Sequence, residues 1–261
     1  MTNIRPDVGV GSDSRADVDK RPDSLDYHRN GFKSVWFGPR YWPLFHTAAA
    51  STTPAQVLWF FEDIQHLLPC IFCRQSYKEF YHHPENPIGD YVYELPEWGG
   101  IMHNHVNKKL SKPLVDPHKA ATIWQDFQNQ QPEKWVDCIL AVLFSIALNY
   151  PCNWQFATSG QGPQDLTPNE LQRFRAYVKF YTEFQCLLPT ESEFRARWVQ
   201  ATQELPASAL SFFSRHHLVS WVHQVARLMG LWTLSLPDTI QSFECHRAQN
   251  CSPSSTTLTC T

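Results

Sequence analysis

Two cysteines three residues apart, Cys70 and Cys73, are the residues of this sequence best suited to do chemistry. They follow Pro69, whose fixed φ suits a first helical turn, and the next residues through His83 favour a helix that Pro84 ends. Unpaired backbone N–H groups at a helix start favour a thiolate, which lowers the pKa of a cysteine placed there. The spacing therefore predicts a redox-active disulfide that is easily made and easily exchanged.

Zinc binding is the main alternative for such a pair. A structural zinc site needs a second pair of Cys or His ligands at similar spacing, and the sequence contains no second Cys-x-x-Cys. A thioredoxin-like motif is also disfavoured, because that motif follows a strand whereas the residues before Cys70 have a helical pattern. A redox pair is favoured over zinc, and we expect no metal site.

The composition is that of an ordinary soluble globular protein. The chain has 261 residues, a formal net charge of −3 and 18% charged residues, so it offers no electrostatic footprint for nucleic acid. Its longest apolar run, 139–147, is far shorter than the roughly 20 residues that span a bilayer. No apolar stretch follows Met1, so we expect neither a signal peptide nor a membrane partner.

Helix signals follow one another without any strand pattern, which predicts an all-α fold. Residues 1–32 are poor in aromatic residues and predict a disordered tail. Helical domains are expected over 33–130 and 131–232. A flexible Ser/Thr-rich tail is expected over 233–261, and it carries three cysteines, Cys245, Cys251 and Cys260.

Caps and prolines predict the helices of the first domain. The first is expected over 39–50, the third from the cysteine pair to His83, and the fourth over 96–110. The second has Thr53 as its N-cap and a capping box with Gln56. Its apolar stripe is Val57, Phe61, Ile64 and Leu68. A short fifth helix has Asp116 as its cap and Pro117 in its first turn.

Polar and aromatic residues recur at helical spacing on two of these helices. Trp42 and His46 stand four apart on one, and His103 and Asn107 stand four apart on another, with Lys112 just beyond. Singly, each is more often a core or surface residue than a ligand. Together they offer stacking surfaces, hydrogen-bond donors and a cation, which a planar phosphate-bearing cofactor needs.

In these motifs the sequence resembles the Erv/ALR sulfhydryl oxidases, which bind FAD in a four-helix bundle completed by a short fifth helix. Residues 38–46 resemble the family's first-helix signature W-x-x-L-H, with Phe45 where Leu is usual. Residues 68–73 resemble its active-site disulfide, and 103–113 resemble its H-N-x-V-N-x-x-L-x-K-P flavin signature. The resemblance covers about 36–127.

The resemblance implies an FAD-dependent sulfhydryl oxidase that forms disulfide bonds in proteins and passes electrons to dioxygen, giving hydrogen peroxide. Cys70 and Cys73 would be catalytic, with a substrate thiolate attacking Cys70 while Cys73 lies against the flavin. The cofactor-binding residues implied are Trp42, His46, Cys73, His103, Asn107, Lys109, Lys112 and Trp124. The partners would be a dithiol or reduced protein and dioxygen, and we expect a homodimer.

One departure from the family concerns a second, structural disulfide between the fourth and fifth helices. The matching positions here are Gly100 and Pro117, so that disulfide is absent and the fifth helix lacks this restraint. The first-helix pattern, with Gly38 and Pro39 before the tryptophan, resembles that of members from large DNA viruses more than that of mitochondrial ones. Such an origin would imply host cytoplasm or virion as the location.

The second half is expected to repeat the helical pattern. Helices are expected over 133–149, 167–188, 190–204 and 207–229, and the last ends at Gly230. Two capping boxes are expected, Thr167 with Glu170 and Thr190 with Glu193. The Leu-Leu-Pro at 187–189 echoes 67–69, which suggests a degenerate copy of the first domain, and convergence on the same way of ending a helix is the alternative.

The other cysteines leave alternatives open. Cys245 and Cys251 are the best candidates for a shuttle disulfide of the kind that family members carry on a mobile arm, and a structural disulfide or free thiols are the alternatives. Cys138, Cys152 and Cys186 have the pattern of core cysteines, and a bridge between the first two is open. The alternative function is a non-enzymatic helical adaptor with a structural or metal-binding cysteine pair.

Overall fold

The computed structural model describes residues 31–50, 53–91 and 94–248. These residues form α-helices, short 3-10 helices and one isolated antiparallel bridge between Phe32 and Arg247, so the all-α fold class is confirmed. No helix within the described ranges combines the length and apolar character needed to cross a membrane.

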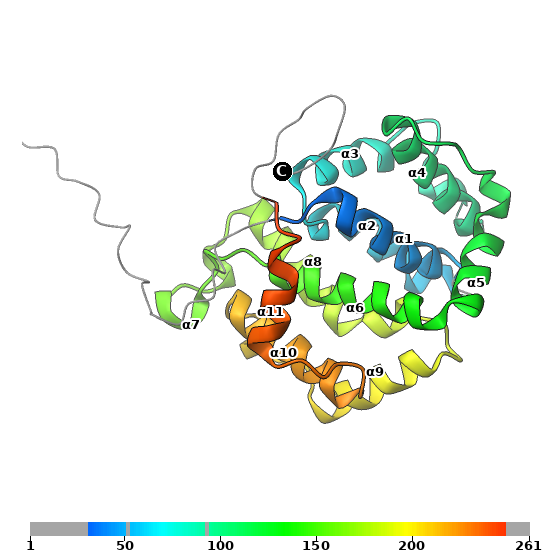
Figure 1. The fold of residues 1–261 in the computed structure, drawn as a ribbon. Helices are drawn as coiled ribbons and strands as arrows, with labels where there is room; N and C mark the ends of the chain where they lie inside the picture. The colour runs from blue at the N-terminus through cyan, green and yellow to red at the C-terminus, as the bar shows by residue number, and fades with distance from the viewer. Residues whose placement is uncertain (1–30, 51–52, 92–93, 249–261) are drawn as a thin grey trace, which may run out of the picture.

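Helices α1 and α2 lie in the middle of the molecule (Figure 1). Helices α4 and α5 pack against one side of α1, and α6 packs against its other side. Helix α2 packs between α3 and α8. The bounds in the first half are α1 (Ser34–Ala49), α2 (Leu58–Leu67), α3 (Ile71–Tyr81), α4 (Leu95–Lys109) and α5 (Ala120–Gln130).

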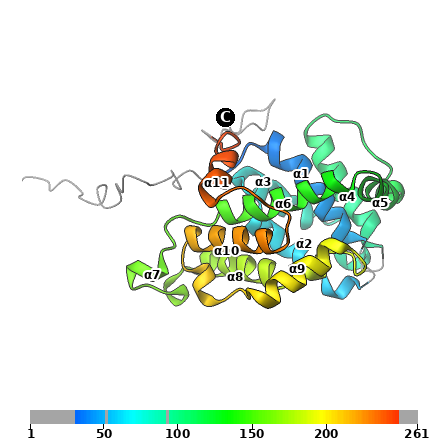
Figure 2. The ribbon, with the colours of Figure 1, turned by 60° about the horizontal axis from the view of Figure 1, so that its bottom comes forward.

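The second half packs around α6, whose side chains are buried along most of its length because other helices surround it. Figure 2 shows α8, α9 and α10 gathered below α6. The bounds are α6 (Pro132–Leu148), α7 (Phe156–Ser159), α8 (Pro168–Thr182), α9 (Glu193–Glu204), α10 (Arg215–Leu228) and α11 (Leu236–Glu244).

One continuous hydrophobic core runs through both halves of the chain. Phe60 of α2 stacks on Phe180 of α8 with their ring centroids 6.4 Å apart. The indole N–H of Trp135 on α6 donates to the Thr47 hydroxyl of α1 at 3.2 Å. The predicted domain boundary at residue 130 falls between α5 and α6, and the core continues across it. A degenerate repeat in the second half stays a prediction.

Helix α1 begins at Ser34, five residues before the predicted start, and contains Pro39 and Pro43. The prediction was wrong because we placed the first proline at the helix start, where its missing N–H is tolerated best. A proline inside a helix leaves the carbonyl four residues earlier without its usual donor. For Pro39 that residue is Val35, which is 65% exposed, so the carbonyl can be solvated.

Two other helix starts were also predicted too early. Helix α9 is capped by Ser192, whose hydroxyl accepts from a backbone N–H at 3.2 Å, and not by Thr190. Helix α10 is capped by Ser214 and begins at Arg215, and the preceding residues form a short 3-10 helix, η7 (Ala209–Phe212). In both cases a serine closer to the main apolar run supplies the cap.

The predicted capping box of the second helix does not form. Residues Pro54–Gln56 make a 3-10 turn, η2, and the Thr53 hydroxyl donates to the Gln56 side chain at 3.1 Å. The apolar stripe of this helix is buried as predicted, and the Thr167 capping box at α8 and the Asp116 cap are confirmed. Gly230, with φ +68°, ends α10 as expected.

The predicted tails are wrong in two places. Residues 236–244 form α11, with Ile240 1% and Phe243 5% exposed, and the Trp232 indole donates to the Thr239 hydroxyl at 2.7 Å. Phe32 is fully buried. Isolated apolar residues within polar stretches hid both segments, because only tertiary contacts show that those residues are covered. The rest of the predicted tails, with Cys251 and Cys260, lies outside the described residues.

Candidate redox and cofactor site

Cys70 is the N-cap of α3, and its sulfur accepts a hydrogen bond from the Cys73 backbone N–H at 3.4 Å. Pro69 lies before the cap and not in the first helical turn, which corrects the expectation. The proline forces Leu68 into an extended conformation (φ −56°, ψ 131°), so the chain turns sharply out of α2 before α3 starts. Both sulfurs therefore lie at the N-terminal end of a helix, where backbone N–H groups favour negative charge.

The two sulfurs differ in exposure. Cys70 is 3% exposed, whereas Cys73 is partly exposed. Above the turn, the Phe32 N–H donates to the Pro69 carbonyl at 3.0 Å. Gly31 has φ +87°, and a Cβ there would lie 3.0 Å from the same carbonyl, so only glycine lets the backbone pass so closely. The segment at 31–32 thus covers the turn that leads into Cys70.

Four rings from three helices form a stacked cluster, which we call the Trp–His cluster: Trp42, His46, His103 and Trp124. Trp42 of α1 stacks on His103 of α4 with centroids 3.7 Å apart. Trp124 of α5 stacks on His46 of α1 at 4.7 Å. The two imidazoles share a hydrogen bond of 3.0 Å between His46 Nε2 and His103 Nδ1. The structure therefore brings these four predicted residues together.

Burial keeps both imidazoles neutral at pH 7. It lowers the pKa of His46 well below its usual value, with His103 adding to the effect. Burial, with the charge of Lys112 nearby, lowers the pKa of His103 to about 4. His46 Nδ1 is buried and has no hydrogen-bond partner among the described residues. That orphaned atom is a polar group that a bound cofactor could satisfy.

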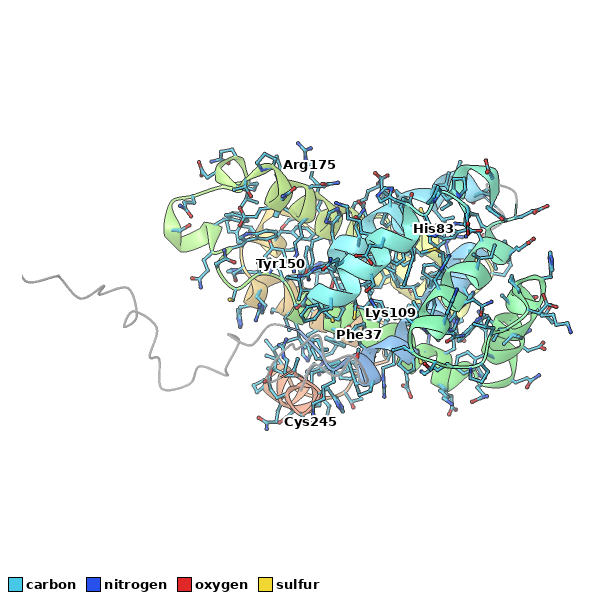
Figure 3. The ribbon with its side chains drawn as sticks, turned by 90° about the horizontal axis from the view of Figure 1, so that it is seen from above. Phe37, His83, Lys109, Tyr150, Arg175 and Cys245 are labelled. Atoms are coloured by element: carbon cyan, nitrogen blue, oxygen red, sulfur yellow. The ribbon has the colours of Figure 1, made fainter. Side chains whose placement is uncertain are left out.

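The remaining predicted residues extend along α4 and beyond it. Asn107 is 7% exposed, and Lys112 is an exposed residue whose charge acts on His103. The Lys109 ammonium donates to the Ser76 hydroxyl of α3 at 2.6 Å, one helical turn after Cys73, and Figure 3 labels Lys109. This bond joins α4 to α3, the helix that begins at the cysteine pair. Sequence reasoning missed Ser76, although its spacing from Cys73 was the available signal.

Tyr41 of α1 lies within electrostatic range of the cysteine pair. The Cys73 sulfur acts electrostatically on Tyr41, whose pKa is raised mainly by burial, and the Tyr41 hydroxyl lies 3.3 Å from the Ser145 hydroxyl of α6. Tyr41 directly precedes Trp42 of the cluster. The stretch of α1 that carries Trp42 therefore lies within electrostatic range of the redox pair.

Two glycines allow α4 to approach its neighbours closely. A Cβ on Gly99 would lie 3.4 Å from His46 Nδ1. A Cβ on Gly100 would lie 2.7 Å from Pro117 Cα and 3.0 Å from Ala120 Cβ. Gly100 and Pro117, the two positions at which the family resemblance would place a disulfide, therefore pack directly against each other.

A cavity of about 390 Å³ lies beside Trp124, between α1, α5 and α6. Arg40, Lys134 and Asp137 line it together with apolar residues and Cys138. Its aromatic residues suit an aromatic ligand, and its two cations and one carboxylate give the lining mixed charge. Among the described residues, no group of three or more His, Cys, Asp or Glu side chains could hold a metal ion.

The other described cysteines stand apart from this site. Cys138, Cys152 and Cys186 are free, so the bridge between the first two that the sequence left open is not formed. Cys245 is exposed at the end of α11 (Figure 3), and its carbonyl accepts from the Lys33 ammonium at 3.2 Å.

A helical bundle that holds a Cys-x-x-Cys pair at a helix start and a stacked Trp–His cluster has the parts of a flavin-linked thiol oxidase. Residues 39–127 match the model of the Erv1/Alr family. The chain is also 34% identical over 98 residues to the mitochondrial FAD-linked sulfhydryl oxidase ERV1 of Saccharomyces cerevisiae. That match covers 34% of this chain and 50% of the yeast protein, so the chain spans about half of that relative's length. No solved structure matched the chain.

Proposed function

We propose that this chain is an FAD-dependent sulfhydryl oxidase that forms disulfide bonds in protein substrates. The observation that carries the proposal is the joint placement, on α1, α3, α4 and α5, of the cysteine pair and the Trp–His cluster. The resemblance of residues 39–127 to the Erv1/Alr family supports the same reading.

The cysteine pair would carry the thiol chemistry. A substrate thiolate attacks the Cys70 sulfur of a Cys70–Cys73 disulfide, forms a mixed disulfide and releases Cys73 as a thiolate. A second substrate thiolate then attacks the substrate sulfur of that mixed disulfide and releases Cys70. The substrate dithiol is oxidised and the cysteine pair is reduced. The start of α3 favours both released thiolates electrostatically.

The residues present fit FAD. Trp42, His103 and Trp124 offer ring faces, His46 Nδ1 is a buried polar atom that needs a partner, and Lys109 offers a cation. Asn107 and Lys112 would complete the set. When bound, FAD would supply the two-electron acceptor and pass electrons to dioxygen, which yields hydrogen peroxide.

The shuttle disulfide, the homodimer and the viral likeness expected from the sequence are also proposals. A shuttle through Cys245 and Cys251 is supported by Ala248, whose N–H donates to the Gly31 carbonyl at 3.3 Å beside the turn that leads into Cys70. Cys251 is the third residue after Ala248, and a segment of that length spans at most about 10 Å. A homodimer stays a prediction. A likeness to members from large DNA viruses also stays a prediction, because the relative reported above is a yeast protein.

Purification of the full chain, followed by spectroscopy and oxygen measurement, tests the proposal. We expect a yellow protein with flavin absorbance that consumes oxygen when dithiothreitol is added. Cys70→Ser and Cys73→Ser should abolish oxygen consumption while retaining flavin, because each removes one sulfur of the exchange. Cys186→Ser, which changes a free cysteine outside the site, is the matched control.

A colourless protein without oxygen consumption would contradict the proposal and favour the non-enzymatic adaptor. Undiminished turnover in Cys73→Ser would show that the flavin is reduced by another route.

A further inference from the structure

Arg74 holds a positive charge next to the cysteine pair. It directly follows Cys73 on α3, and its Nη1 donates to the Leu68 carbonyl at 3.0 Å. Its backbone N–H also bonds to the Cys70 carbonyl at 3.0 Å. Because Leu68 lies two residues before Cys70, the guanidinium braces the turn that positions both sulfurs.

A second arginine, Arg173, reaches the same region from α8 in the other half of the chain. Its Nη2 donates to the Tyr177 hydroxyl at 3.4 Å, and its guanidinium lies over the Tyr177 ring at 5.7 Å. The Tyr177 hydroxyl donates to the Asn149 carbonyl at 2.9 Å, and the Asn149 side chain accepts from the Gly31 N–H at 3.0 Å. Gly31 in turn passes against Pro69. A continuous set of contacts thus joins Arg173 to the redox turn.

These cations form no salt bridge in the part of the chain that the structure describes, and Glu170 of α8 acts on Arg173 only through its more distant charge. No salt bridge there includes Arg74, Lys78 or Arg173. Burial and then the charge of Arg173 lower the pKa of Arg74, and the two cysteines act in the opposite direction. The Nε atom of Arg173 and the Nε2 atom of His66 are buried without a hydrogen-bond partner among the described residues. An anion between these groups would relieve the repulsion.

We propose that Arg74 and Arg173 together stabilise the thiolate form of the redox-active cysteines, so that the second half of the chain supplies one of the two cations. The proposal rests on the proposed function, because it concerns the thiolates of that exchange. When a substrate thiolate opens the Cys70–Cys73 disulfide, the electron pair of the broken S–S bond stays on Cys73. Both arginines act as positioning residues through the cysteines and do not contact substrate.

The other titratable groups around the pair contribute less. His66 of α2 has its pKa lowered by burial first and then by Arg173 and Arg74, so it carries little charge at neutral pH. Lys78 of α3 is exposed, where solvent screens its charge. Tyr177 of α8 donates its hydroxyl to the Asn149 carbonyl. The positive groups left to act on the pair are therefore the arginines and the N-terminal end of α3.

The pH dependence of cysteine alkylation tests the proposal directly. The full chain is reduced without oxygen and treated with iodoacetamide from pH 5 to 9, and peptide mass mapping follows Cys70 and Cys73 separately. A nearby opposite charge lowers a pKa by about 1–3 units, so Arg74→Gln and Arg173→Gln should slow alkylation of the more reactive thiol at pH 7 by about tenfold. Arg175→Gln, which changes an exposed residue of the same helix, should leave the rate within about twofold of the parent.

Two further measurements separate charge from packing. Arg74→Lys and Arg173→Lys keep the charge, so each should restore most of the alkylation rate at pH 7 even where a hydrogen bond is lost. Circular dichroism checks the fold of every variant. If Arg173→Gln does not fold, the alkylation rates of Arg74→Gln, Arg74→Lys and Arg173→Lys still test the proposal. An unchanged pH profile in Arg74→Gln, or an equal change in Arg175→Gln, would overturn the proposal.

Alkylation needs neither flavin nor turnover, so its result is independent of oxidase activity. A protein that lacks oxidase activity but shows the shift would keep the arginine proposal and refute the oxidase. An active oxidase without the shift would keep the oxidase proposal and refute the arginine proposal.

Discussion

Gly100 provides a sharp test of how α4 packs against the segment that leads into α5. We expect Gly100→Ala to destabilise the protein, although alanine is normally the better helix residue by about 0.5–1 kcal/mol. The added Cβ would lie 2.7 Å from Pro117 Cα and 3.0 Å from Ala120 Cβ. The nearer of these contacts is with backbone, so α5 must move. Overpacking of this kind costs about 1–3 kcal/mol.

Gly89→Ala is the matched control. Gly89 lies in the 3-10 helix η3 (Ile88–Tyr91), and a Cβ there would meet no atom within 4 Å. The control should therefore be neutral or stabilising by up to about 1 kcal/mol. Because both substitutions reduce the freedom of the unfolded chain equally, the difference between them isolates the contact with Pro117.

Urea denaturation and FAD titration together measure the effect. The free energy of unfolding of Gly100→Ala should fall about 1–3 kcal/mol below that of Gly89→Ala, and in a chain of this size each kcal/mol corresponds to about 2–4 °C in melting temperature. Since α5 carries Trp124 onto His46 at 4.7 Å, displacement of α5 should also weaken FAD binding. Equal stability of the two variants would refute the close packing of α4 on Pro117.

Three more outcomes follow from the site. His46→Ala should release FAD on gel filtration, because it removes one ring of the Trp–His cluster, whereas His83→Ala outside the cluster should retain it. The pKa of His103 is about 4 in the folded chain and about 6.5 in the unfolded chain. Between about pH 6.5 and pH 4 the unfolded chain therefore binds one more proton at this residue than the folded chain does. Up to about 3 kcal/mol of stability is lost as the pH falls through this range. His103→Gln should lack this component, so urea denaturation at pH 7 and 4.5 should show a smaller decrease than in the parent; an equal decrease would contradict it. Truncation after Ala248 should leave dithiothreitol oxidation intact but lower turnover of reduced thioredoxin, because a tethered cysteine raises the local thiol concentration; equal turnover of both substrates before and after truncation would argue against a shuttle.

The sequence could predict the centre of the site because local spacing determines it. The helix start at Cys70 depends on a proline turn and on α3 itself, and the positions of Trp42 and His46 follow from one helix face. Residues four apart on a helix must lie near one another whatever the tertiary structure. The motif resemblance then linked the helices, and the structure brings Trp42, His103 and Trp124 together as expected.

The remainder depends on tertiary contacts that spacing does not encode. Helix α11 has only a few apolar residues, and they become a core face because Phe243 packs on Phe32 with their centroids 6.3 Å apart. The Arg247 guanidinium lies over the Phe32 ring at 4.5 Å, so the two ends of the described chain hold each other in place. For this reason a truncation after Trp232 would remove core residues, and the shuttle has to be tested by a cut after Ala248.

The shared core gives the second half a physical role even though it lacks a cysteine pair of its own. Helix α6 covers α1, where Ser145 meets Tyr41, and α8 covers α2, where Phe180 meets Phe60. Without them the central helices would expose apolar side chains to water, which costs about 25 cal/mol for each Å². The same α8 that buries α2 also carries Arg173 toward the cysteine turn. Structural support and electrostatic tuning therefore come from one helix, so substitutions on its buried face should alter stability and cysteine reactivity together, whereas those on its exposed face should alter neither.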